Sequence, residues 1–232
     1  MKTKIISMFL FVLFISTVVC SKTEQSGSKA NLSNDKGKYS YVFGYNVGLG
    51  MARDYVDLDM DSFIAAVEDA LNGVDSKLTP EETQTVIQNF RESLQKKRKD
   101  MAAENKKKGE EFLSKNKKNE GVLTTSSGLQ YKIISKGNSE IKPISNDTVK
   151  VHYSGRFIDG KEFDSSYKRK EPTMFKVNQV IRGWTEGLQL MTVGSKYEFF
   201  IPSDLGYGPG GNQAIPGNSV LIFEVELLEI VK

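Results

Sequence analysis

The feature that most constrains this fold is an unbroken helical pattern of about 35 residues that begins at Thr79. Thr79 can cap the helix, Pro80 suits its first position, and Glu82 completes a capping box. The apolar residues that follow recur on one face: Val86, Phe90, Leu94 and Met101. A helix that runs to about residue 114 would be roughly 50 Å long, which is more than the width of a small domain. We therefore expect this helix to connect two separate parts of the chain.

A shorter helical pattern covers residues 39–55. Its apolar residues lie near helical spacing: Tyr41, Val42, Tyr45, Leu49 and Ala52. Gly44 and Gly48 share one face of this helix, where another backbone could approach closely, although glycine also weakens a helix. The pair favours close packing against another helix, and the alternative is a poorly formed helix.

A second short helix is predicted for residues 59–71, with Asp59 or Asp61 as its cap and Gly73 at its end. Phe63, Val67 and Ala70 line one face of it. Short amphipathic helices cannot bury their apolar faces alone. We therefore expect the N-terminal helices to form a homodimer with a second copy of the chain.

The first twenty residues have the pattern of an export signal. A basic start at residues 1–4 is followed by an uncharged apolar run at residues 5–19, which is too short for an ordinary membrane-spanning helix. Cys20, the only cysteine, ends this run and resembles in position the lipidated cysteine of bacterial lipoproteins. We predict lipidation of Cys20, with an ordinary cleaved signal as the alternative. The polar residues 21–36 predict a flexible tether.

The charge pattern gives little support for nucleic-acid binding. The formal net charge is +3, which is small for 232 residues. Lysines cluster in the long helix at residues 96–99 and 106–108, but acidic residues interrupt them and no aromatic residues are interleaved. This pattern favours a solvated helix face over a nucleic-acid site, and contact with an anionic membrane surface is a further alternative.

After Gly121 the pattern changes from helix to strand. Strands are predicted at residues 128–134, 148–153, 196–201 and 221–227. Asp159 and Gly160 predict a hairpin with a tight primed turn between two further strand segments. The one helical pattern of this half covers residues 180–191, with Asn178 as its cap. These elements predict an α+β domain in which an antiparallel sheet curls over a short helix.

Residues for the common catalytic and metal sites are missing. The single histidine, His152, lies in a strand with its side chain opposite Val151 and Tyr153, which favours a structural or exposed histidine. One histidine and one cysteine cannot supply a metal site, and no hydrolase nucleophile is evident. The glycine-rich loop at residues 206–211 is not followed by a helix, as a phosphate-binding loop would be. We expect no metal and no cofactor.

Five segments in the C-terminal half resemble an FKBP domain: residues 151–155, 159–166, 180–188, 207–208 and 215–227. They occur in the order of that family and cover about residues 121–232. The front half is similar, less specifically, to the dimerisation region of the macrophage infectivity potentiator group of bacterial FKBPs. The residues themselves predict a signal segment at 1–20 and a tether at 21–36. The resemblance implies a dimerisation domain with a linker helix at 37–120 and a peptidyl-prolyl cis/trans isomerase at 121–232.

The resemblance also implies a set of site residues. Trp184 would form the pocket floor under the proline ring, and the walls would be Tyr153, Phe163, Phe175, Val180, Ile181, Ile215 and Phe223. Tyr207 would donate its hydroxyl to a substrate carbonyl, and the N–H of Ile181 would bind the peptide. Asp164 would make a polar contact near the twisting amide, with Arg169 as the partner that holds it. Phe199 and Phe223 could also be plain core residues.

Rotation about a prolyl bond needs no covalent chemistry. The barrier of about 18–20 kcal/mol comes from amide resonance, so a dry apolar site that accepts the twisted amide can lower it. The resemblance therefore implies an isomerase that acts on prolyl bonds of exported proteins, in the periplasm or at the outer membrane or cell surface of a bacterium, with membrane contact only through the lipid anchor. The alternative is a periplasmic chaperone or peptide-binding module that uses the same pocket without turnover.

Overall fold

The computed structural model describes residues 30–53 and 55–231 of the chain. The chain divides into two compact units, one that ends at Val47 and one that begins at Gly48. The predicted signal segment, Cys20 and most of the predicted tether lie outside the described residues.

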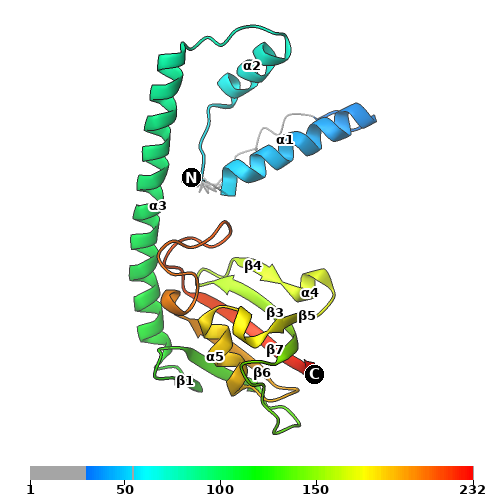
Figure 1. Ribbon diagram of the computed structural model, residues 1–232, viewed down its shortest axis with the longest axis vertical. Coiled ribbons are helices and arrows are strands. Elements are labelled where there is room, and N and C mark those ends of the chain that lie inside the picture. Colours follow the sequence, from blue (N-terminus) through cyan, green and yellow to red (C-terminus); the bar gives the residue numbers. More distant parts are fainter. Residues whose placement is uncertain (1–29, 54, 232) are drawn as a thin grey trace, which may run out of the picture. The chain divides into compact units, whose positions relative to one another are not determined.

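The front of the chain is helical, as the sequence predicts (Figure 1). The three helices are α1 (Asp35–Arg53), α2 (Met60–Leu71) and α3 (Pro80–Asn116). Asp59, not Asp61, caps α2, because its Oδ1 accepts the Ser62 N–H at 2.7 Å. Both hydrogen bonds of the predicted capping box are present at the start of α3, and Pro80 is its first residue. Helix α1 begins at Asp35, four residues before the apolar pattern that predicted it.

Neither α1 nor α2 contains a buried residue. Their large apolar side chains stay exposed in the single chain, with Phe43 at 71% and Leu71 at 82% of full exposure. No helix within residues 30–53 and 55–231 combines the length and the apolar character needed to cross a membrane.

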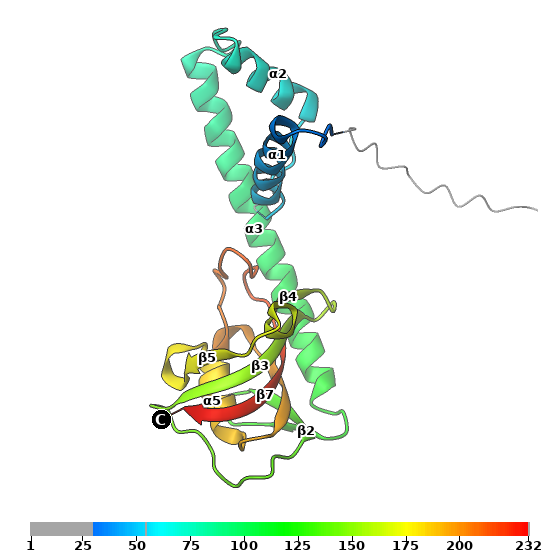
Figure 2. The same ribbon diagram turned by 90° about the vertical axis from the view of Figure 1, so that its right-hand side faces the viewer.

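The C-terminal part is an antiparallel sheet of seven strands (Figures 1 and 2). The strands are β1 (Val122–Thr124), β2 (Gln130–Ser135), β3 (Thr148–Phe157), β4 (Glu162–Ser165), β5 (Thr173–Lys176), β6 (Lys196–Ile201) and β7 (Leu221–Val231). They are ordered β1-β2-β6-β7-β3-β4, and β5 also pairs with β3. Helix α5 (Arg182–Leu190) packs on one face of the sheet, and their apolar side chains form the core. The α+β fold predicted from the sequence is therefore confirmed.

The hairpin predicted around Asp159 and Gly160 is present, since β3 pairs with β4, but the predicted type of turn is wrong. Gly160 closes a three-residue hairpin loop, in which the Gly160 N–H donates to the Phe157 carbonyl and the Phe157 N–H donates to the Lys161 carbonyl, each at 3.0 Å. Within this loop only Gly160 has a positive φ (87°), whereas a two-residue primed turn of type I′ needs one at Asp159 as well.

Asn178 does not cap α5. It lies in a separate single turn, Val177–Gln179, and its side-chain amide donates to Asn146 Oδ1 at 3.1 Å. Extended backbone at Val180 and Ile181 separates this turn from α5, which has no side-chain cap. The helix is therefore shorter than the predicted range 180–191.

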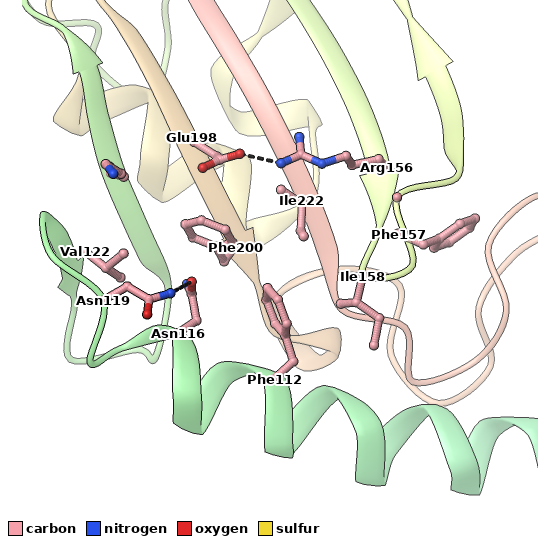
Figure 3. A pocket seen from close by; sticks show the side chains of 12 residues that line it. Phe112, Asn116, Asn119, Val122, Arg156, Phe157, Ile158, Glu198, Phe200 and Ile222 are labelled. Carbon is pink, nitrogen blue, oxygen red and sulfur yellow. Dashed lines mark hydrogen bonds and ion pairs between the residues drawn. The ribbon is translucent and has the colours of Figure 1, made fainter.

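The last turns of α3 pack on the sheet face that points away from α5 (Figure 3). The Phe112 ring lies 6.0 Å from the Phe200 ring, centroid to centroid. The buried Asn116 side chain donates to Gln130 Oε1 at 2.9 Å, and Gln130 donates back to the Leu113 carbonyl at 2.9 Å. A hollow of about 340 Å³ remains between this part of the helix and the sheet. Helix α3 is thus part of the domain as well as a connector.

Candidate active site

The inner side of the sheet encloses a cavity of about 680 Å³. Strands β3, β4, β5 and β7, helix α5 with the residues just before it, and the loop before β7 each contribute to its lining. The lining residues are Tyr153, Phe163, Asp164, Phe175, Gln179, Val180, Ile181, Trp184, Tyr207, Asn212, Ala214, Ile215 and Phe223. This cavity is the candidate active site.

Trp184 forms the floor, and three aromatic rings stand at steep angles to it. The ring centroids of Tyr153, Phe175 and Phe223 lie 5.2–5.4 Å from that of Trp184, at interplanar angles of 79–89°. This edge-to-face arrangement suits aromatic quadrupoles and fixes the ring positions. Trp184 Nε1 is buried and has no partner among the described residues, so it is a polar group that a ligand could satisfy.

Two glycines of α5 let the helix, and with it Trp184, lie close to the sheet. A Cβ built at Gly183 would lie 2.5 Å from the Ile201 side chain, and one at Gly187 would lie 2.7 Å from the Phe199 ring. Both distances are too short for real contacts, so a larger residue would push the helix outward. Phe199 is fully buried beneath the helix and does not line the cavity.

Asp164 is held at the cavity edge by two donors. The Tyr153 hydroxyl donates to Asp164 Oδ2 at 2.6 Å, and Arg169 donates to Asp164 Oδ1 at 2.5 Å. Arg169 also donates to the Tyr153 hydroxyl oxygen at 2.7 Å, which closes a triangle of hydrogen bonds. Arg169 reaches this point from the short helix α4 (Ser166–Arg169), which Ser165 caps directly after β4.

These contacts set the charge of the site. Burial acts to raise the pKa of Asp164, but the hydrogen bonds from Tyr153 and Arg169 outweigh it and hold that pKa below the usual aspartate value. Burial and the bond to Asp164 raise the pKa of the Tyr153 hydroxyl. At neutral pH the cavity therefore contains an ionised carboxylate beside a protonated phenol.

Two further donors belong to residues that line the cavity and have no hydrogen-bond partner in the part of the chain that the structure describes. Tyr207 is 40% exposed, and its hydroxyl makes no hydrogen bond within the described part of the chain. Burial raises the pKa of Tyr207, so its proton is available for donation. The N–H of Ile181, at the start of α5, likewise has no acceptor among the described residues, while the Ile181 carbonyl accepts from Trp184 and Thr185.

The structure brings together all the residues predicted for the floor and walls, together with Asp164 and Tyr207. Arg169 lies behind Asp164 and does not line the cavity. His152 faces away, as predicted: its ring stacks on Tyr167 with centroids 4.7 Å apart, and its Nδ1 lies 3.0 Å from Ser166 Oγ.

Three lining residues were missed: Gln179, Asn212 and Ala214. Gln179 ends the single turn before α5, and the other two lie in the polar loop between Tyr207 and Ile215. For Asn212 and Ala214 the sequence signal was the position of this loop between two predicted site residues, and for Gln179 it was the neighbouring site residue Val180.

An antiparallel sheet that holds Trp184 of a short helix at the floor of an aromatic cavity is the arrangement that the resemblance to an FKBP domain implies. Residues 139–228 match the family described as FKBP-type peptidyl-prolyl cis-trans isomerase. Residues 36–133 match the domain described as amino terminal to FKBP-type peptidyl-prolyl isomerase. The chain belongs to the FKBP family and is a peptidyl-prolyl cis-trans isomerase.

Relatives match this chain over nearly its whole length. The FKBP-type peptidyl-prolyl cis-trans isomerase FkpA of Aeromonas hydrophila is 41% identical, over 98% of this chain and 94% of that protein. The outer membrane protein MIP of Legionella longbeachae is 40% identical, over 100% and 99%. The crystal structure of FkpA from Escherichia coli superposes with a TM-score of 0.62 at 41% identity and covers 86% of this chain and 98% of that one.

Proposed function

We propose that the cavity around Trp184 is the site of prolyl isomerisation and that its substrates are exported polypeptides. The observation that carries this proposal is the combination of an edge-to-face aromatic floor with an ionised carboxylate fixed at its rim. We also propose residues 37–120 as the dimerisation and linker region and residues 121–232 as the isomerase domain. The two family matches support this division.

The proposed chemistry follows from what twisting does to an amide. Rotation removes resonance, so the carbonyl oxygen loses part of its negative charge on the way to the transition state. An apolar cavity beside the negative charge of Asp164 favours this less polar, twisted form over the planar one. Tyr207 and the Ile181 N–H then serve to hold the peptide in register. Trp184, Asp164 and Tyr207 are the proposed catalytic residues.

The test compares turnover with binding. The full chain should accelerate isomerisation of a Leu-Pro or Phe-Pro peptide with no metal or nucleotide added, against an uncatalysed reaction that takes tens to hundreds of seconds. Trp184 is the only tryptophan, so its fluorescence reports peptide binding in the same sample. Peptide binding without acceleration would favour the chaperone or peptide-binding module instead.

We propose that α1 and α2 are covered by a second copy of the chain. The exposed large apolar residues of α1 are Tyr39, Tyr41, Val42, Phe43, Tyr45, Val47 and Leu49. A Cβ built at Gly44 or Gly48 meets nothing within 4 Å, so this face of α1 is open in the single chain. Apolar faces of this size need a partner, and the family's amino-terminal domain supports a dimer.

Light scattering should report a dimer for residues 30–232 and a monomer for a chain that starts at residue 100, which keeps the part of α3 that packs on the sheet. Gly48→Leu separates helix formation from association. Leucine should raise the helix content, since glycine disfavours helices by about 1 kcal/mol relative to alanine, but it should weaken the dimer by blocking close approach. A monomeric 30–232 chain contradicts the proposal.

We propose that the protein is exported and anchored at a membrane through a lipid on Cys20. The apolar run that ends at Cys20 motivates this, and the relative named outer membrane protein MIP supports a place at the cell envelope. Mass spectrometry of the protein from its native membrane should find a lipid-modified cysteine as the first residue. A mature N-terminus at another residue, with no lipid, would exclude the anchor.

A further inference from the structure

The loop before β7 forms one side of the candidate active site. We call residues 206–219 the pocket loop. It contributes Tyr207, Asn212, Ala214 and Ile215 to the cavity lining, so its position decides the shape of that side. The loop contains no helix or strand, and its residues are therefore placed by individual hydrogen bonds.

Hydrogen bonds within the loop tie its parts together. Asn212 Oδ1 accepts the N–H groups of Ala214 and Ile215, each at 2.8 Å, and the Asn212 N–H donates to the Ile215 carbonyl at 2.8 Å. The Asn218 N–H donates to the Gly208 carbonyl at 2.8 Å, next to Tyr207. A displacement near residue 218 would therefore move Gly208, next to Tyr207, through this hydrogen bond, and Ile215 through the chain itself.

Helix α3 holds the C-terminal end of this loop through two hydrogen bonds from asparagine side chains, one donated by the helix and one donated by the loop. Asn105 Nδ2 donates to the Gly217 carbonyl at 3.0 Å, and Asn218 Nδ2 donates to the Ala102 carbonyl at 3.0 Å. Gly217 lies two residues from Ile215 in the cavity wall. Both bonds are partly buried, so water competes less for them than it would on an open surface.

The helix also approaches this region very closely. A Cβ built at Gly109 would lie 2.7 Å from the Val220 side chain, just after the pocket loop. Asn105, Gly109, Phe112 and Asn116 follow one another at helical spacing and together form the face of α3 that contacts the loop and the sheet. Phe112 and Asn116 anchor this face at its sheet end, where both point toward β6 and its neighbours (Figure 3).

We propose that Asn105 is a positioning residue of the isomerase: by holding Gly217, it fixes the pocket loop and with it the Ile215 and Tyr207 side of the cavity. The inference rests on the proposed function of that cavity. It places a determinant of substrate binding on α3, outside the strands and loops that line the site.

The test uses the full chain and the fluorescence of Trp184. Asn105→Ala should weaken binding of a Leu-Pro peptide about two- to tenfold, the range expected for one hydrogen bond. The rate constant for isomerisation of the bound peptide should change less than the affinity of the chain for that peptide. Asn105→Asp, which keeps the shape but presents an acceptor to the Gly217 carbonyl, should be at least as weak. Asn89→Ala, an exposed position on the same helix, is the matched control and should bind like the wild type.

Amide hydrogen exchange separates a positioning role from general destabilisation. In Asn105→Ala, the amides of residues 208, 212 and 215 should exchange faster, while those of β3 and β7 should keep their wild-type rates. Gly109→Ala tests the same contact between α3 and the loop independently, because its methyl group would push Val220 and the helix apart. It should weaken binding, and Gly109→Ala with Val220→Ala should recover part of the loss.

Wild-type affinity and loop exchange in Asn105→Ala would overturn the inference. A lower melting temperature with unchanged affinity would do so as well, since that result describes a purely structural residue. Asp164→Ala and Tyr207→Phe serve as reference variants in the same assays. If both of them behave as wild type, the proposed site itself is wrong; if they are impaired while Asn105→Ala is not, only the role of α3 is wrong.

Discussion

Replacing Asp164 with alanine should lower kcat/KM for a Leu-Pro or Phe-Pro peptide by about tenfold or more while the domain stays folded. Among the described residues that line the cavity, Asp164 is the one with an ionised side chain, and Tyr153 and Arg169 fix it in place. Its removal takes away charge next to the twisting amide without opening a hole in the core. A tenfold loss corresponds to about 1.4 kcal/mol of transition-state stabilisation, a reasonable size for one such contact.

Three further variants show whether the loss of kcat/KM in Asp164→Ala comes from the missing charge. Asp164→Asn keeps the shape and removes the charge, so it should resemble the alanine variant if charge is what matters. Tyr207→Phe should lose a smaller factor, because it removes one hydrogen bond. His152→Ala should change the rate little, since His152 packs on Tyr167 outside the cavity. A folded Asp164→Ala chain with wild-type kcat/KM would remove Asp164 from the mechanism.

The pH dependence of the same reaction follows from the pKa of Asp164. Because that pKa is lowered in the folded chain, the carboxylate stays ionised from pH 5 to pH 8, and kcat/KM should be flat there. Its contribution to stability is fully present above the unfolded pKa of about 3.9 and is lost as the pH falls through the lower folded value. The Asp164→Asn variant should lack this acid limb in both activity and stability.

Much of the fold could be predicted because local signals agree with tertiary packing. The capping box at Thr79 and the alternation of Val149, Val151 and Tyr153 each follow from neighbouring residues alone. Strands β1 and β5 were missed because three or four residues cannot display a period of two. Each exists through pairing with another strand: β1 with the next strand, β2, and β5 with β3, whose paired residues lie more than twenty positions earlier in the sequence.

The contact face of α3 was missed for a different reason. Asn105, Gly109, Phe112 and Asn116 include one large apolar residue, so no hydrophobic stripe marks them in the sequence. They contact the domain through amide hydrogen bonds and through the absence of a side chain at Gly109. Patterns of hydrophobicity report burial of apolar area, and this contact uses little of it.

Gly155→Ala should have the second large effect, on both activity and stability. Gly155 lies on β3 with its missing side chain facing the cavity walls: a Cβ built there would be 2.6 Å from the Phe223 ring and 2.7 Å from the Phe163 ring. Real contacts of this kind do not occur, so both rings must move. Overpacking of this size destabilises by about 1–3 kcal/mol.

The rings that must move are walls of the active site, so activity should fall further than stability implies. A displacement of about 1 Å at a binding site can lower a rate up to a hundredfold, and we expect a loss of ten- to a hundredfold in kcat/KM. Urea denaturation and the peptide assay measure the two effects separately. Gly210→Ala is the matched control, because a Cβ there meets nothing within 4 Å and both values should stay near wild type.

A second substitution distinguishes crowding from loss of backbone freedom. Gly155 has no positive φ, so its backbone conformation is open to alanine, and the nearest atoms that a Cβ would meet belong to the Phe223 and Phe163 rings. Gly155→Ala with Phe163→Leu should therefore recover part of the stability, because the smaller side chain removes one of the two close contacts while Phe223 keeps the other. Activity should recover less, since the double variant lacks one aromatic wall. Wild-type stability and rate in Gly155→Ala would mean that the Phe163 and Phe223 rings move at little cost, and that a rigid aromatic cavity does not set the rate.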